Sequence, residues 1–316
     1  MTPAPRRPAR TAARRPHRRA AALLLTVGVL ALAVVSLSIT ARRSMAEALR
    51  ARAAADDLQR RLIVASIERG VLPYAAEILE VAERDAGAAG SVAWSADLGD
   101  VAVRCRLADE QAKLNLNAFA DRHERWVVEE AVRSLTASMP DRPTVRLRPH
   151  RAPAPEESAL PAYGSFDQVF EHAAPEALLP SGSDEVAGID RLTLWGDGRV
   201  NALRADPEVL VLACRGLLSE VEVRRLIRAR SERTGDEQDL TALLQQAGIG
   251  AGGAQGEESP LAERLTMESS CFSAWITLAT DQRRHDVLLV REAPPEPERE
   301  TSGETQAPVF YRLEWE

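Results

Sequence analysis

The stretch RRPHRRAAALLLTVGVLALAVVSLSITARR, residues 14–43, decides how this chain is organised. Its central run, Ala20–Ala41, carries no charge, and arginines lie on both sides. As a helix this run spans roughly 30 Å, the thickness of the hydrocarbon core of a bilayer, whereas the core of a signal peptide has only about 7–15 residues. No small-residue cleavage pattern followed by a break comes after it. We therefore predict a retained transmembrane helix over residues 20–41.

The charges beside this run predict its orientation. Residues 1–19 hold seven arginines and no acid, whereas acids join the arginines soon after residue 43. Because basic flanks stay on the cytoplasmic side, we predict a basic cytoplasmic leader over residues 1–19, with the rest of the chain exported. A nucleic-acid arm is the alternative for this leader. The net charge of −7 argues against DNA or anionic lipid as the main partner of the whole chain.

An exported amphipathic helix is predicted over residues 42–90. Apolar residues recur there at helical spacing, and charged residues fill the other face. Pro73, with Gly70 just before it, predicts a kink or break. The apolar stripe needs a partner surface, and its candidate residues are Leu49, Ala53, Leu62, Ala65, Leu72 and Leu79.

Alternating apolar residues predict strands near both ends of the exported part. Val101–Leu107 alternates early, and SCFSAWITLATD, RHDVLLVRE and VFYRLEWE alternate at the C-terminus. An early strand must then pair with late ones. We predict an α+β fold with a long N-terminal transmembrane helix and a small antiparallel sheet from residues 91–117 and 265–316. An all-helical domain, residues 118–264, is inserted into this sheet, in a pilin-like arrangement.

Several helix signals support the inserted domain. The sequence predicts a helix over Ala118–Met139, a short helix capped by Ser165, and helices that start near Pro207, Ser219 and Glu237. The segment RLTLWGDGRVNAL predicts a short extended pair around a glycine turn. Two halves of the domain look alike, because Asn117 and Asn201 both stand between a short strand and a helix; chance similarity of two helix starts is the alternative.

Catalytic and metal patterns are scarce. The histidines form no H-E-x-x-H pattern and the sequence has no G-x-S-x-G, so we expect no enzyme activity. Asp184, Glu185 and Asp190 are candidate metal ligands, with a solvated loop as the alternative. The cysteines, Cys105, Cys214 and Cys271, either include one disulfide or are three buried apolar residues.

Four features together resemble one known family. They are the N-terminal helix that continues past the membrane; DEQAKLNLNAF at Asp109–Phe119, an acidic turn with an N-L-N segment; GSFDQVF at Gly164–Phe170; and GRVNALRADPEVLVLAC with the helix that follows and ends in I-x-x-R. In this order and spacing the chain resembles general secretion pathway protein K, a family of minor pseudopilins in type II secretion systems. The matching motif residues are Asn115, Asn117, Asn201, Pro207 and Arg230.

The resemblance implies a structural subunit at the tip of a short pseudopilus that takes part in protein export. Its partners would be other minor pseudopilins and the inner-membrane secretion platform. It would be a single-pass protein of the inner membrane, with a cytoplasmic N-terminus and its bulk in the periplasm. The resemblance would also imply calcium after the first inserted helix, but MPDRPTVRLRPHRAPAPEE has too few clustered acids, so we expect no cofactor.

A nucleic-acid-binding protein is the competing interpretation. The helix pairs after Asn117 and Asn201 are somewhat similar to helix-hairpin-helix units, which suits a membrane-anchored DNA receptor of the uptake type. The segment CRGLLSE has one glycine where such hairpins carry G-[IV]-G. We therefore favour the secretion subunit and expect no nucleic acid partner.

Overall fold

The computed structural model of the chain describes residues 16–86, 90–137, 143–148, 163–171, 190–232, 239–249, 260–280, 283–293 and 308–315. The leader up to residue 15, most of the proline-rich segment after Met139, and the candidate metal ligands Asp184 and Glu185 lie outside these ranges. The chain divides into two compact units, residues 1–62 and 63–316.

The first unit is helical. Helix α1, Pro16–Gly70, contains the uncharged run, whose apolar side chains are exposed, as Leu24 and Leu32 illustrate at 72% and 71%. By length and composition this helix can cross a membrane, with a mean hydropathy of 2.6 over its most apolar window. This agrees with the prediction of an N-terminal membrane helix.

Pro73 interrupts the helix, as the sequence predicts. Helix α1 ends at Gly70, a 3₁₀ turn η1 covers Leu72–Tyr74, and α2 covers Ala75–Ala86. Proline has no N–H group and its ring clashes with the preceding turn, so it kinks or breaks an α-helix.

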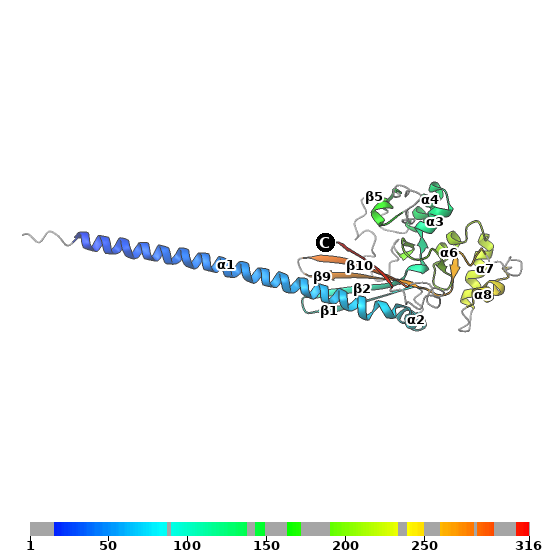
Figure 1. The fold of residues 1–316 in the computed structure, drawn as a ribbon, viewed down its shortest axis with the longest axis horizontal. Helices are drawn as coiled ribbons and strands as arrows, with labels where there is room; N and C mark the ends of the chain where they lie inside the picture. Colours follow the sequence, from blue (N-terminus) through cyan, green and yellow to red (C-terminus); the bar gives the residue numbers. More distant parts are fainter. Residues whose placement is uncertain are drawn as a thin grey trace, which may run out of the picture. The chain divides into compact units, whose positions relative to one another are not determined.

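A five-stranded antiparallel sheet forms the centre of the second unit (Figure 1). Its strands are β1 Ser91–Leu98, β2 Val101–Asp109, β9 Cys271–Ala279, β10 Arg284–Glu292 and β11 Val309–Trp315, in the order β1-β2-β9-β10-β11. The predicted pairing of the early strand with the late ones is confirmed, since Cys105 lies opposite Ile276.

One face of the sheet is covered by helix. Val103 and Leu107 of β2 and Ile276 of β9 are buried with Leu72 and Leu79 in one cluster. Side chains alternate between the two faces of a strand, so every second residue enters this core. Each fully buried leucine contributes about 1.5–3 kcal/mol to stability.

The chain between β2 and β9 forms a mainly helical insertion. Its helices gather beyond one end of the strands in Figure 1. They are α3 Leu116–Arg122, α4 Arg125–Leu135, α6 Pro207–Ala213, α7 Glu220–Ser231 and α8 Leu240–Gln246. Asp206 caps α6, and Ser219 and Glu222 form a capping box on α7, so the starts predicted near Pro207 and Ser219 are confirmed.

Some details of the insertion differ from the predictions. The single helix predicted over Ala118–Met139 is wrong, because His123 and Glu124 are extended and separate α3 from α4. The hydroxyl of Ser165 does not cap a helix: it bonds Asp167, and only a 3₁₀ turn, η3 Phe166–Gln168, and the short strand β5 Phe170–Glu171 follow.

The prediction that the segments before and after Gly196 and Gly198 pair with each other is also wrong. Strand β6, Leu192–Thr193, pairs in parallel with β3, Leu114–Asn115, and β7, Val200–Asn201, pairs in parallel with β8, Leu265–Thr266. Strands β3 and β8 therefore belong to the insertion rather than to the main sheet. A third small sheet pairs β4, Thr144–Val145, with β5.

Candidate interaction surface and polar junction

The predicted partner stripe is only partly exposed. Leu49 and Leu62 are 60% and 59% exposed, Ala53 is exposed and Ala65 is half-buried. The prediction that Leu72 and Leu79 face a partner is wrong, because both are fully buried in the core beneath the sheet.

The exposed part of the stripe does not follow one face of α1. At about 100° per residue, the 13 positions from Leu49 to Leu62 amount to roughly three full turns plus about 220°, so the two leucines lie on nearly opposite sides. Leu49 and Ala53, four residues apart, share one side. Two separate surfaces of α1 are thus open to a partner.

The motif DEQAKLN, Asp109–Asn115, forms a buried polar junction where β2 leaves the sheet. The junction consists of Asp109, Glu110, Gln111, Lys113 and Asn115, and each is at most 6% exposed. Asp109 is fully buried and caps the 3₁₀ turn η2, Glu110–Ala112, by accepting the N–H of Gln111 at 2.9 Å. Buried polar groups must be paired, so this motif fixes the start of the insertion.

Glu110 bonds three other side chains, from the end of the turn η2, the sheet and the insertion. One of its carboxylate oxygens accepts from Lys113 Nζ and from the Ser273 hydroxyl of β9, and the other accepts from the Thr193 hydroxyl of β6. Without their backbone atoms, the side chains of Lys113 and Glu110 are 7% and 1% exposed. Charge-assisted bonds in such a dry site tie the sheet to the insertion.

Arg204 connects three parts of the second unit. Its Nε donates to Glu83 of α2 at 2.7 Å, and its Nη1 lies 3.4 Å from the Asp109 carboxylate. Burial lowers the Arg204 pKa, but the hydrogen bond to Glu83 and the charges of both acids outweigh it and raise the pKa above its usual value. Burial raises the pKa of Asp109, although bonds from Ser269 and Arg204 oppose that rise.

The internal similarity pairs Asn201 with Asn115 rather than with Asn117. Asn115 ends β3 and its side-chain oxygen accepts the Ala118 N–H at 3.0 Å; Asn201 ends β7 and accepts the Leu203 N–H at 2.9 Å. Both are buried at the end of a two-residue parallel strand. The two places share one device, an asparagine that turns a strand into the next segment.

The other motif residues stabilise the backbone of the insertion. Asn117 donates to the carbonyls of Tyr163 and Leu194 at 3.0 and 2.9 Å. Pro207 begins α6, where its missing N–H costs nothing. Arg230 donates to the Ala205 carbonyl at 2.6 Å, just before that helix. These contacts lie within the chain, so the structure gives these residues an architectural role.

Sequence reasoning singled out the junction motif but missed its partners. Arg204 belongs to the stretch GRVNALRADPEVLVLAC but was given no role there, and Glu83 and Ser273 belong to no motif. Only the folded chain brings the three residues to Asp109 and Glu110. The sequence held one indication of this junction: two acids, Asp109 and Glu110, end an alternating strand at a place where an apolar residue is typical.

No described group has the arrangement of a metal or redox site. Within the described ranges, no three His, Cys, Asp or Glu side chains could hold a metal ion. Asp190, a candidate ligand, instead accepts from Arg106 at 2.7 Å.

The three cysteines are free and buried, in agreement with the apolar alternative rather than a disulfide. Burial raises the pKa of Cys105 to about 12 and that of Cys214 to about 11, and it raises the pKa of Cys271 well above the usual value. These thiols are therefore protonated at neutral pH and act as small apolar side chains.

Comparison with known proteins finds a structural neighbour. No protein-family model matches the chain, and no curated protein does. Among solved structures, it is similar to a chain of the GspK–GspI–GspJ complex from the type 2 secretion system of enterotoxigenic Escherichia coli. The sequence identity is 15% and the TM-score 0.43, over 84% of this chain and 99% of that chain. The chain thus has a structural neighbour among type 2 secretion proteins.

Proposed function

We propose that the chain is a minor pseudopilin, a structural subunit of a type II secretion pseudopilus that takes part in protein export. One observation carries the proposal: a membrane-compatible helix runs into an antiparallel sheet that a helical insertion divides between β2 and β9. The helix supplies an anchor, the sheet covers its last turns, and the insertion adds a large head. This is the arrangement that the sequence motifs imply.

The same features support a position at the tip. The insertion adds five described helices to the end of a small sheet, and such a head leaves little room for another subunit above it. The uncharged run carries no glutamate before Glu47. A tip subunit has no predecessor whose N-terminal amine such a glutamate would neutralise.

The proposed partners are other minor pseudopilins and the inner-membrane platform. Contact would run from helix to helix through the exposed residues Leu49, Ala53 and Leu62 of α1. In this proposal the protein is single-pass in the inner membrane, with its basic leader in the cytoplasm and the second unit in the periplasm. It binds no nucleic acid, needs no cofactor and has no turnover.

Capture of partner subunits tests the proposal. The tagged full chain is co-expressed with minor pseudopilins, solubilised in detergent and purified. We expect pilin-like subunits to co-purify, and we expect Leu49→Arg or Leu62→Arg to reduce their capture, because each places a charge on an exposed apolar side of α1.

The two variants control each other, because both add the same charge at equally exposed positions on nearly opposite sides. A partner that packs on one side loses capture with only one of them. Co-purification of no pilin-like subunit, together with salt-dependent DNA binding, would favour the DNA-uptake alternative instead.

A further inference from the structure

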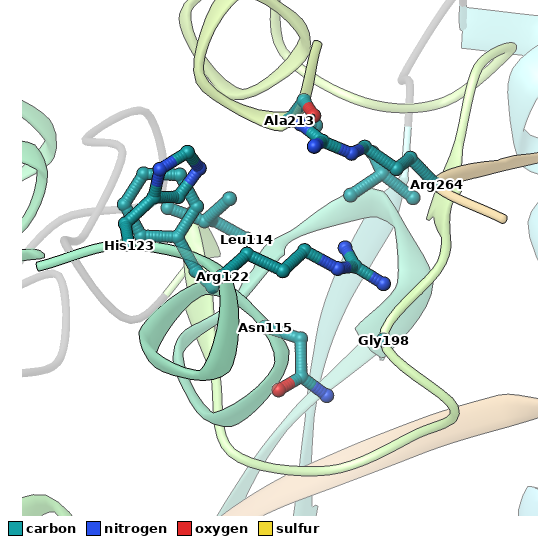
Figure 2. Close-up of a pocket in the computed structure, with 9 residues that line it drawn as sticks. Leu114, Asn115, Arg122, His123, Gly198, Ala213 and Arg264 are labelled. Atoms are coloured by element: carbon teal, nitrogen blue, oxygen red, sulfur yellow. Dashed lines mark hydrogen bonds between the residues drawn. The ribbon is translucent and has the colours of Figure 1, made fainter. Parts of the chain in front are cut away.

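A small basic pocket lies within the insertion, where α3 ends. Arg122 and His123 line it from the end of α3, Arg264 lines it from just before β8, and Ala213 of α6 closes one side. Figure 2 shows the Arg264 side chain extending toward Ala213, with His123 and Arg122 also bordering the pocket. Its volume is about 10 Å³, which is room for roughly one oxygen atom.

The described part of the chain accepts only some of the N–H groups of Arg122 and Arg264. The Nη1 of Arg264 donates to the carbonyls of Ala213 and Arg215, at 3.3 and 2.8 Å. Arg122 makes one long contact, 3.4 Å, to the carbonyl of Glu263. A guanidinium carries five N–H groups, so most of those on Arg122 and Arg264 have no acceptor among the described residues.

No carboxylate among the described residues forms an ion pair with Arg122 or Arg264. Arg215, whose carbonyl accepts from Arg264, pairs with Glu130 at 3.7 Å. Burial and the charge of Arg122 lower the pKa of Arg264, whereas the Glu263 carboxylate acts on Arg264 through its charge and raises this pKa. Burial lowers the pKa of His123, and the charges of Arg264, Arg215 and Arg122 lower it further. The Nε2 atom of His123 is buried and has no hydrogen-bond partner in the described part of the chain.

We propose that this pocket binds one oxyanion group, a sulfate, a phosphate or a carboxylate. One oxygen of the anion enters the pocket and accepts from the free N–H groups of Arg122 and Arg264, while the rest of the group faces solvent. His123 supplies the third donor through Nε2. Charge-assisted bonds of this kind are about twice as strong as neutral ones, and they relieve the repulsion between the cations. The site gives the insertion a contact for an acidic group, apart from the proposed helix partners.

The charges around His123 determine whether anion binding strengthens or weakens as the pH falls. His123 faces Arg122, Arg215 and Arg264, which all stay charged, and the ring of Phe119, whose centroid lies 4.3 Å away. A bound anion favours the charged imidazole and raises the pKa of His123. By linkage, the anion binds more tightly as the pH falls through this pKa.

The test uses the full chain in detergent micelles with ¹⁵N-labelled histidine. Sodium sulfate and sodium acetate are titrated separately against sodium chloride at constant ionic strength. We expect a saturable shift of the His123 resonance and a higher His123 pKa with at least one of the two anions. Tighter binding of sulfate points to an inorganic anion, and tighter binding of acetate points to a protein carboxylate.

Matched variants assign the effect to the pocket. Arg122→Gln, at an exposed position that leaves the packing intact, is expected to weaken binding about tenfold. Arg224→Gln removes the same charge from the surface of α7, where the Arg224 side chain is 71% exposed. It should leave the anion affinity unchanged. At position 264 the variant is Arg264→Lys, because Arg264→Gln would lose the charged contacts to two backbone carbonyls and could fail to fold. Arg264→Lys keeps a cation there and should retain part of the affinity. A His123 resonance that neither anion shifts, or equal affinities for Arg122→Gln and Arg224→Gln, would overturn the proposal.

Discussion

Replacing Arg204 by methionine tests whether the polar junction holds the second unit together. The change keeps much of the side-chain volume but removes the charge that pairs Glu83 and Asp109. Asp109 is fully buried, and Arg204 is 13% exposed, so solvent cannot replace the lost partner. Removing one partner from a buried charged pair costs about 3–5 kcal/mol. Glu83 is 28% exposed and can be solvated, so it adds little to this loss.

The burial of Asp109 also predicts how the stability lost in Arg204→Met depends on pH. Burial raises the pKa of Asp109, and removal of Arg204 raises it further. An acid whose folded pKa is raised destabilises the fold above its unfolded pKa, and this cost disappears as the pH falls and the acid is protonated. The difference between Arg204→Met and the parent should therefore be largest near pH 7 and shrink toward pH 4.

Urea unfolding of the full chain in detergent, followed by tryptophan fluorescence, measures the effect as a shift of the midpoint. Adding Asp109→Asn to Arg204→Met should recover part of the loss, because a neutral side chain then occupies the buried site. Arg224→Met, which breaks an exposed pair with Glu220, is the control and should cost at most about 0.5 kcal/mol. A loss below about 1 kcal/mol for Arg204→Met, with no pH dependence, would refute the reasoning.

Three further substitutions probe the core, a turn and an acid. Leu72→Ala should lower the free energy of unfolding by about 2–5 kcal/mol in urea, because it leaves a cavity under the sheet, whereas Leu62→Ala at an exposed position should change it little. Gly198→Ala should destabilise by at least about 1 kcal/mol, since its φ of 84° is unfavourable and a new Cβ would lie 2.4 Å from Ala118 Cβ. Burial raises the pKa of Glu292, so Glu292→Gln should stabilise the protein near pH 7 but not near pH 4, as thermal unfolding at both pH values would show.

Local patterns predicted the larger elements. The uncharged run predicted a long helix, Pro73 its interruption, and period-two alternation the strands β2, β9, β10 and β11. The caps of α6 and α7 were also readable, because Asp206 and Ser219 bond backbone groups only two or three residues away. Such signals depend on neighbours in the sequence, and distant parts of the chain do not alter them.

The sequence by itself thus determined a long apolar N-terminal helix, a small sheet and an inserted block. Only the tertiary structure decided which residues of the predicted stripe stay exposed, because Leu49 and Leu72 were both assigned to it and yet only Leu72 packs in the core under the sheet. It also decided the two-residue parallel strands and the junction around Glu110, whose partners Thr193 and Ser273 lie 83 and 163 positions away. The physical reason is that burial and ion pairing depend on distances in space, which no local period encodes.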